Sequence, residues 1–297
     1  MANSLVFGVV LALWIQYVSP ASFEYVNQAK WYDDYSQCSF KRQSPIELNT
    51  NESKISYDLP KLYFNNYQML YPQKVVVENN GHTANINLPK VDVESLFGKS
   101  LLNQILPQIY GGPLHADRFI AESVHFHWGS KDTHGSEHVI DSTRHTMEMH
   151  ILHRNSKYDT VEVARENPDG LAVTAVIFQA HEDNYDFSGL NSVIERLDMV
   201  ENYNTTTEIE SFFILDNLIT GLDSDSYFTY EGSLTTPPCS ESVTWVVFTD
   251  ILPMSHFQMK KFHKLRDEHN TVLQNNYRSL QAKGSRVVTL RKHAVKK

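Results

Sequence analysis

Short apolar runs of strand length dominate the sequence, and they constrain its fold more than any other feature. Runs such as K-V-V-V-E, L-A-V-T-A-V-I-F and S-V-T-W-V-V-F are rich in β-branched residues, as strands are. The turn sequences N-N-G-H, Y-G-G-P-L and N-P-D-G separate such runs. Helical periodicity is confined to a few pieces, such as Gly189 to Glu201 and Ser255 to Glu268. There is no internal repeat and no Pro/Gly/Ser-rich linker. The sequence therefore predicts a single β-rich domain with a few peripheral helices.

Composition is consistent with a soluble globular protein. The 297 residues are 41% apolar and 21% charged, which leaves ample material for a core. The net charge of −9 argues against a nucleic-acid partner, because such proteins need a clustered basic surface. The last twelve residues are locally basic, and we interpret them as a solvated tail.

The first residues are typical of a secretory signal. An 11-residue apolar run, Leu5 to Ile15, is too short to span a bilayer, and Ser19 and Ala21 fit a small-x-small cleavage pattern before Ser22. No Lys or Arg precedes the run, so a buried N-terminal segment is the alternative. We predict a signal peptide over residues 1–21 and one domain over residues 22–297.

Two further features fit an exported protein. Only two cysteines occur, Cys38 and Cys239, so a single disulfide is possible, with a pair of free thiols as the alternative. Two N-x-[ST] sequons, at Asn51 and Asn204, lie in polar stretches that suit glycosylated loops. There is no second apolar run near the C-terminus, so the sequence indicates neither a membrane anchor nor a lipid-anchor tail. We therefore expect a secreted, extracellular protein.

Histidines at strand spacing indicate a metal site. His125 and His127 are two residues apart, so on a strand both imidazoles project from one face, and Glu148 and His150 repeat the spacing. If the two strands are neighbours, three imidazoles converge. Three neutral nitrogens with one open position are what a catalytic Zn²⁺ requires. The alternative is that these are ordinary polar strand residues, as we interpret three other histidines of the segment, His134, His145 and His153. No H-E-x-x-H motif occurs, which argues against a zincin-type protease.

Nine separated motifs resemble the α-class carbonic anhydrases in order and spacing. They are R-Q-S-P-I-E-L, N-N-G-H-T-A, G-G-P-L, H-F-H-W-G-S, G-S-E-H, M-E-M-H, P-D-G-L-A-V, Y-F-T-Y-E-G-S-L-T-T-P-P-C and V-T-W-V-V-F, between about Phe23 and Val288. The resemblance implies a mixed, β-dominated domain with a central twisted sheet of about ten strands, mostly antiparallel. It also implies a cone-shaped cavity with zinc at its base, and cis peptides before Pro45 and Pro238.

The resemblance also implies the reaction. A zinc-bound hydroxide would convert CO₂ reversibly to bicarbonate and a proton, with esterase activity on the side. Carbonic anhydrase is itself the standard example of zinc lowering the pKa of bound water to about 7. The alternative is that the protein is not an enzyme but a zinc-bearing scaffold or binding protein with the same fold.

Individual roles follow from the matching positions. One Zn²⁺ per chain would be held by His125, His127 and His150. Thr235 would accept a hydrogen bond from zinc hydroxide and pass its own proton to Glu137, and His82 would be the proton shuttle. The apolar wall for CO₂ would comprise Leu152, Val173, Leu234, Val243 and Trp245, with Thr236 helping to hold bicarbonate.

Residues around these positions would support them. Glu148 would fix the tautomer of His150, and Tyr25 would order cavity water; His138 and Tyr230 occupy supporting positions as well. The two cysteines match a disulfide of extracellular members. One departure stands out: Ser123 replaces the usual glutamine that supports His125. We expect a tuned site, since all three zinc ligands remain.

Overall fold

The computed structural model describes residues 23–71, 73–89, 105–131, 134–181, 185–209 and 213–293. The predicted signal peptide and the last four residues of the basic tail lie outside these ranges. None of the helices in these ranges has the length and apolar character needed to span a bilayer.

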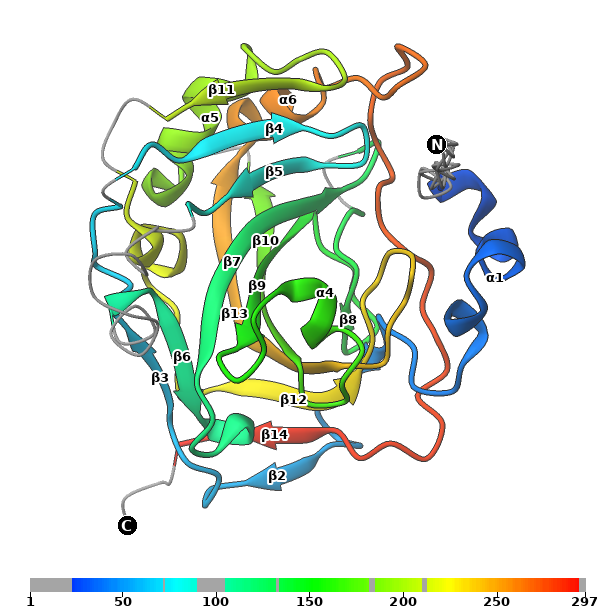
Figure 1. The fold of residues 1–297 in the computed structure, drawn as a ribbon, viewed down its shortest axis with the longest axis vertical. Coiled ribbons are helices and arrows are strands. Elements are labelled where there is room, and N and C mark those ends of the chain that lie inside the picture. The colour runs from blue at the N-terminus through cyan, green and yellow to red at the C-terminus, as the bar shows by residue number, and fades with distance from the viewer. Residues whose placement is uncertain are drawn as a thin grey trace, which may run out of the picture.

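A large mixed sheet forms the body of the described residues (Figure 1). It has 12 strands, and ten of them follow the order β11-β4-β5-β7-β9-β10-β13-β12-β14-β2. Strand β6 pairs with β3 on one side and with the first residues of β7 on the other. The pairs β10–β13 and β14–β2 are parallel, whereas the other pairs are antiparallel. The predicted β-dominated fold with a mostly antiparallel central sheet is confirmed.

The bounds of the strands are as follows: β1 (Glu47–Leu48), β2 (Lys54–Ser56), β3 (Leu62–Asn65), β4 (Val76–Asn79), β5 (Ala84–Asn87), β6 (Gln108–Gly111), β7 (Phe119–Trp128), β8 (Val139–Ile140), β9 (Met147–Asn155), β10 (Leu171–His181), β11 (Thr205–Glu208), β12 (Tyr227–Gly232), β13 (Val243–Ser255) and β14 (Thr289–Arg291). Strands β1 and β8 form a separate two-stranded parallel sheet.

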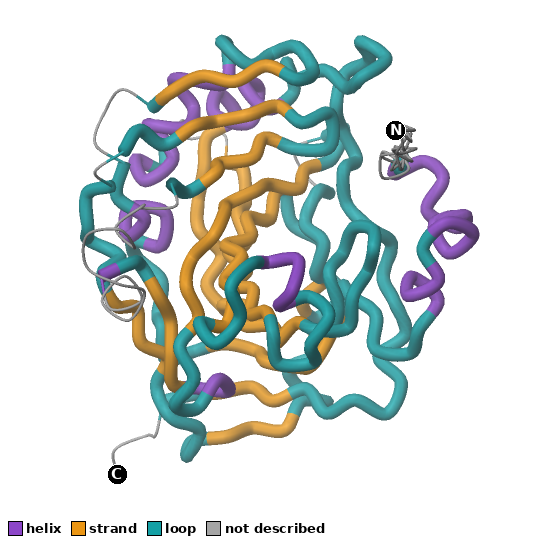
Figure 2. Tube along the Cα trace, in the orientation of Figure 1, coloured by secondary structure: helices purple, strands orange, loops and turns teal. Residues whose placement is uncertain are grey.

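Helices are short and lie around the sheet (Figure 2). They are α1 (Trp31–Asp34), α4 (Val161–Ala164), α5 (Asn191–Leu197) and α6 (His256–Phe262), with 3₁₀ helices η1 (Tyr25–Lys30), η2 (Ser36–Ser39), η3 (Gly112–Leu114), η4 (Ser188–Leu190) and η5 (Leu215–Ile219). Helices α5 and α6 fall within the two predicted helical stretches but are shorter. Beyond α6 the chain turns back on itself, since the backbone N–H of Leu273 donates to the carbonyl of Leu265.

Alternation along the central strands separates core side chains from those that face the site. On β7, Val124, Phe126 and Trp128 belong to the larger apolar cluster, as do Met147 and Met149 of β9. The residues between them point to the opposite face of the sheet. That face carries His125, His127, Glu148 and His150. The hydrophobic pattern therefore determines which face the histidines share.

Candidate metal centre

The register of two neighbouring strands brings the three predicted ligands together. Strands β7 and β9 pair antiparallel, so that His125 lies opposite His150 and His127 lies opposite Glu148. The Nδ1 atom of His150 is 3.1 Å from Nε2 of His127 and 3.2 Å from Nε2 of His125. All three nitrogens lie within 4.8 Å of one another. Tetrahedral Zn²⁺ with Zn–N distances of about 2.0–2.1 Å would place its ligand nitrogens about 3.3–3.4 Å apart. The spacing therefore fits this ion.

Hydrogen bonds fix which nitrogen of each buried imidazole carries its lone pair. Nδ1 of His127 is 2.7 Å from the carbonyl oxygen of Asn276, which can only accept, so this nitrogen carries the proton. Nε2 of His150 is 2.7 Å from Oε1 of Glu148 and donates to it. The remaining nitrogens, Nε2 of His127 and Nδ1 of His150, thus point lone pairs at one centre. Two lone pairs that converge at 3.1 Å repel each other unless a cation lies between them, so the arrangement favours a cation.

Burial favours the neutral form of His125 and His127, which is the form that binds a metal. Desolvation lowers the pKa of His125 well below its ordinary value, and positive charge on His127 or His150 would lower it further. Desolvation also lowers the pKa of His127, against an opposing effect of the Glu137 carboxylate. Neutral rings at this centre are free to coordinate a metal near neutral pH.

Comparison with known proteins identifies the family. The family model described as eukaryotic-type carbonic anhydrase matches residues 26–292, which is most of the chain. The chain belongs to the eukaryotic-type carbonic anhydrase family. Mouse carbonic anhydrase 6 (Mus musculus) is 36% identical over 268 residues, covering 89% of this chain and 77% of the relative. Human carbonic anhydrase 6 (Homo sapiens) is 34% identical, covering 89% and 80%. Mouse carbonic anhydrase 15 is 32% identical, covering 88% and 78%.

In this member of the carbonic anhydrase family, a buried hydrogen-bond network surrounds the candidate ligands. The carboxylate of Glu148 accepts from His150, from the backbone N–H of His138 at 2.7 Å and from its ring Nδ1 at 2.6 Å. Nε2 of His138 lies 2.8 Å from the hydroxyl of Tyr230, which donates in turn to Ser44. Burial alone would raise the pKa of Glu148, but these imidazoles hold it well below its usual range. The structure therefore brings together the predicted supporting residues Glu148, His138 and Tyr230.

Glu137 lies beside the centre with one oxygen unpaired. Its Oε1 accepts the backbone N–H of Arg278 at 2.7 Å, whereas its Oε2 is 3.6 Å from Nε2 of His127. This Oε2 atom is buried without a hydrogen-bond partner. Thr235 is buried as well, but no hydrogen bond among the described residues joins it to Glu137. The proton relay between them stays a prediction.

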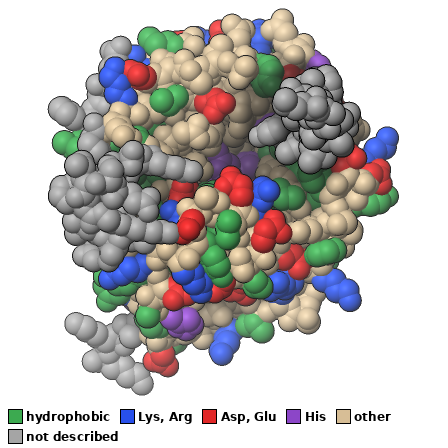
Figure 3. Space-filling model, viewed as in Figure 1, with side chains coloured by type: hydrophobic (Ala, Val, Ile, Leu, Met, Phe, Trp, Pro, Cys, Tyr) green, Lys and Arg blue, Asp and Glu red, His purple; other side chains and the backbone are tan. Residues whose placement is uncertain are grey.

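His82 and the loop after Thr235 line a common cavity. The cavity has a volume of about 470 Å³, and Pro237 and Pro238 form part of its wall. Thr236 is half-buried at the start of this loop. The face seen in Figure 3 is hollowed near its middle, and histidine side chains are visible in the hollow. Burial lowers the pKa of His82, although the carboxylates Glu268 and Asp267 act in the opposite direction.

Tyr25 is half-buried beside Phe23 and Trp31. Desolvation raises the pKa of Tyr25 well above its ordinary value, and the charge of Glu137 adds to the effect. The role of Tyr25 in ordering cavity water stays a prediction.

The five residues predicted for the CO₂ wall form part of one apolar cluster. Val173, Val243 and Trp245 are buried in it, and Leu152 and Leu234 pack against it half-buried. In the sheet, Val173 lies between Leu152 of β9 and Trp245 of β13. Trp245 also contacts the ring of His150, with ring centroids 4.9 Å apart. This apolar cluster therefore adjoins the three histidines.

Ser123 does not support His125 directly. Both residues are partly buried, and among the described residues no hydrogen bond joins their side chains. A serine hydroxyl is too short to replace the longer glutamine amide. Within the part of the chain that the structure describes, His125 therefore has no hydrogen-bond partner of the kind that Asn276 provides for His127 and Glu148 for His150.

The disulfide expected from the resemblance is present between Cys38 and Cys239, and the peptides before Pro45 and Pro238 are cis, as expected. The sequon asparagines Asn51 and Asn204 are exposed.

Sequence analysis missed two residues of the site. The backbone carbonyl of Asn276 accepts a hydrogen bond from Nδ1–H of His127, and the backbone N–H of Arg278 donates to Glu137. Both lie in irregular chain between helix α6 and strand β14, where no periodicity marks them. The motif N-N-Y-R was the only available signal.

Proposed function

We propose that this chain catalyses the reversible hydration of CO₂ to bicarbonate and a proton, with one Zn²⁺ held by His125, His127 and His150. The observation that carries the proposal is the convergence of lone pairs from rings whose outer nitrogens are fixed by Asn276 and Glu148. Zinc bound there would supply a nucleophile derived from water near neutral pH, chemistry for which carbonic anhydrases are the standard example.

Other residues of the chain would bind CO₂, orient the nucleophile and carry the proton away. The apolar wall around Val173 and Trp245 would hold neutral CO₂ without competing water. Glu137, with its buried free Oε2, would accept a hydrogen bond from the Thr235 hydroxyl once that side chain turns toward it. Thr235 would thereby orient the nucleophile, and Thr236 would help to hold bicarbonate. His82 would carry the released proton toward solvent, because an imidazole can bind and release protons near neutral pH.

Several further properties belong to the same proposal. The single domain over residues 22–297 would follow a signal peptide over residues 1–21. The protein would be secreted without a membrane anchor and would carry glycans at Asn51 and Asn204. Activated esters would be hydrolysed as a side reaction, because the same nucleophile can attack an accessible carbonyl.

Metal analysis and stopped-flow CO₂ hydration on one batch of purified protein test the proposal. We expect one zinc per chain and hydration that a chelator abolishes. His150→Ala, and the less buried His125→Ala, should each lose both. His145→Ala is the matched control: this histidine lies in the same segment, but its ring contacts Gln179 instead of the centre. It should keep zinc and activity.

Two results would contradict the proposal in different ways. Full zinc content in His150→Ala would show that the metal binds elsewhere. One zinc per chain without hydration would favour the alternative of a zinc-bearing binding protein.

A further inference from the structure

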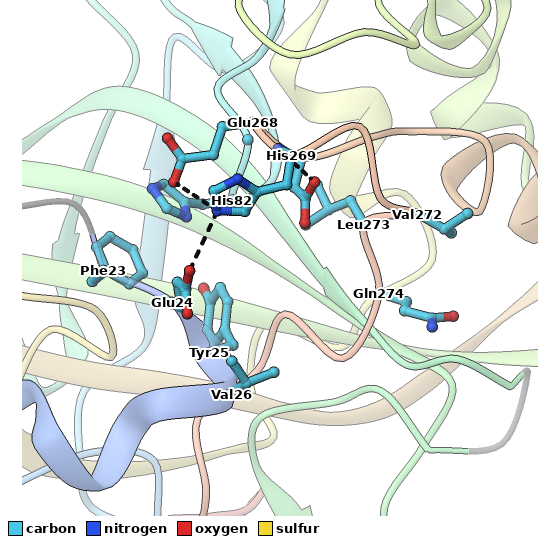
Figure 4. A pocket seen from close by; sticks show the side chains of 12 residues that line it. Phe23, Glu24, Tyr25, Val26, His82, Glu268, His269, Val272, Leu273 and Gln274 are labelled. Atoms are coloured by element: carbon cyan, nitrogen blue, oxygen red, sulfur yellow. Dashed lines mark hydrogen bonds and ion pairs between the residues drawn. The ribbon is translucent and has the colours of Figure 1, made fainter.

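His82 also lines a second, smaller cavity, to which the function proposed above assigns no role (Figure 4). Its volume is about 180 Å³, which leaves room for several waters at about 30 Å³ each. Three segments of the chain line it: residues 23–26, the pair Gly81–His82, and residues 267–269 with 272–274. Its lining includes a second imidazole, that of His269.

Two residues that are consecutive in the chain, Phe23 and Glu24, contact His82 and His269 respectively. The ring of Phe23 stacks on His82, with centroids 4.0 Å apart and planes inclined by 14°. The next residue, Glu24, places its Oε1 3.4 Å from Nε2 of His269. A Cβ added to Gly81 would lie only 3.6 Å from the backbone nitrogen of Glu268. The residues preceding the two histidines are therefore packed together.

Negative charge gathers around His269 in the cavity. Oε1 of Glu268 is 3.7 Å from Nε2 of His269, so two carboxylates face this nitrogen, and Asp267 also lines the cavity. His269 is 63% exposed, whereas His82 is half-buried under Phe23. These carboxylates would stabilise a positive charge on His269.

We propose that His269 is a second proton acceptor, which takes the proton from His82 through water in this cavity and delivers it to bulk buffer. The proposal rests on the CO₂ hydration proposed above. An N–H bond of the His82 imidazolium breaks and an N–H bond forms on His269, while protons shift along the intervening water. The His269 imidazolium then gives its proton to a buffer base, so that one proton leaves per turnover and no electrons move.

The test compares His269→Ala, His82→Ala and a matched control in the zinc-loaded full chain. The control is His293→Ala, because His293 is similarly exposed, at 60%, and lies between the carboxylates of Asp223 and Asp225. Initial hydration rates are measured by stopped flow in dilute and in concentrated buffer. A general acid or base contributes about 10²–10⁴-fold; because His82 retains some access to solvent, we expect His269→Ala to lower kcat in dilute buffer by only about 3- to 10-fold.

The remaining readouts separate a proton relay from a structural role. In His269→Ala, kcat/KM for CO₂ should not change, and concentrated buffer should restore kcat, because proton transfer follows CO₂ conversion. A loss that buffer does not restore, or an equal loss in His293→Ala, would overturn the relay. Parent rates in His269→Ala, alongside a slow His82→Ala, would refute the relay and leave the proposed function intact. A zinc-loaded parent without hydration would refute both.

Discussion

Removing the disulfide should destabilise the protein strongly, because this bond closes a very long loop. Cys38 and Cys239 are separated by 201 positions. On the chain-entropy model such a loop contributes about 5 kcal/mol to the free energy of unfolding, which is an upper figure. With an unfolding entropy of about 2.1 cal/mol/K per residue, the midpoint temperature should fall by at most about 8 °C.

The contacts around the bond indicate what should survive its loss. The backbone N–H of Cys239 donates to the carbonyl of Thr236 at 2.9 Å, and Gln43 donates to the carbonyl of Cys239. These bonds do not depend on the sulfurs, so the loop that carries Thr235 should keep its conformation. We therefore expect Cys38→Ala/Cys239→Ala to hydrate CO₂ while it remains folded.

Denaturant unfolding of the parent, both single variants and the double variant provides the measurement. Each variant loses the crosslink, and both cysteines are buried. The difference between the single and double variants therefore isolates the packing contribution. A decrease below about 1 kcal/mol in all three would refute the entropic reasoning. Loss of turnover in a fully folded double variant would refute the inference about the loop.

Three further predictions follow from individual side chains. Ser123→Gln should give His125 the acceptor it lacks and tighten zinc binding by about 10-fold or more, measured by competition with a chelator; unchanged affinity would contradict this. Val173→Phe, at a position only 2% exposed, should lower hydration by about 10-fold or more at unchanged zinc content; parent turnover would exclude Val173 from the CO₂ wall. Burial lowers the pKa of His153 to about 3, against about 6.5 when unfolded. The unfolded chain therefore binds an extra proton between these values, and the free energy of unfolding should fall as pH drops from 6.5 toward 3. Glutamine does not titrate in this range, so His153→Gln should weaken the dependence of the free energy of unfolding on pH, measured by acid unfolding. An unchanged dependence would show that other groups cause it.

The predictions from sequence were most accurate where chemistry depends on local spacing. His125 and His127 had to share a face on any strand, and the same holds for Glu148 and His150. The two predicted helical stretches contain α5 and α6, but both helices end early. Local periodicity continues past Phe262, whereas the backbone pairing of Leu273 with Leu265 redirects the chain.

The strand-like pattern, the faces on which side chains lie and the motifs that identify the family can all be read from the residues alone. The register that sets His125 opposite His150 depends on tertiary packing. Tertiary packing also supplied the distant partners, Asn276 for His127 and Arg278 for Glu137, which are 149 and 141 positions away. The physical reason is that backbone alternation is a local property. Strand register and contacts from irregular chain depend on how the whole domain packs.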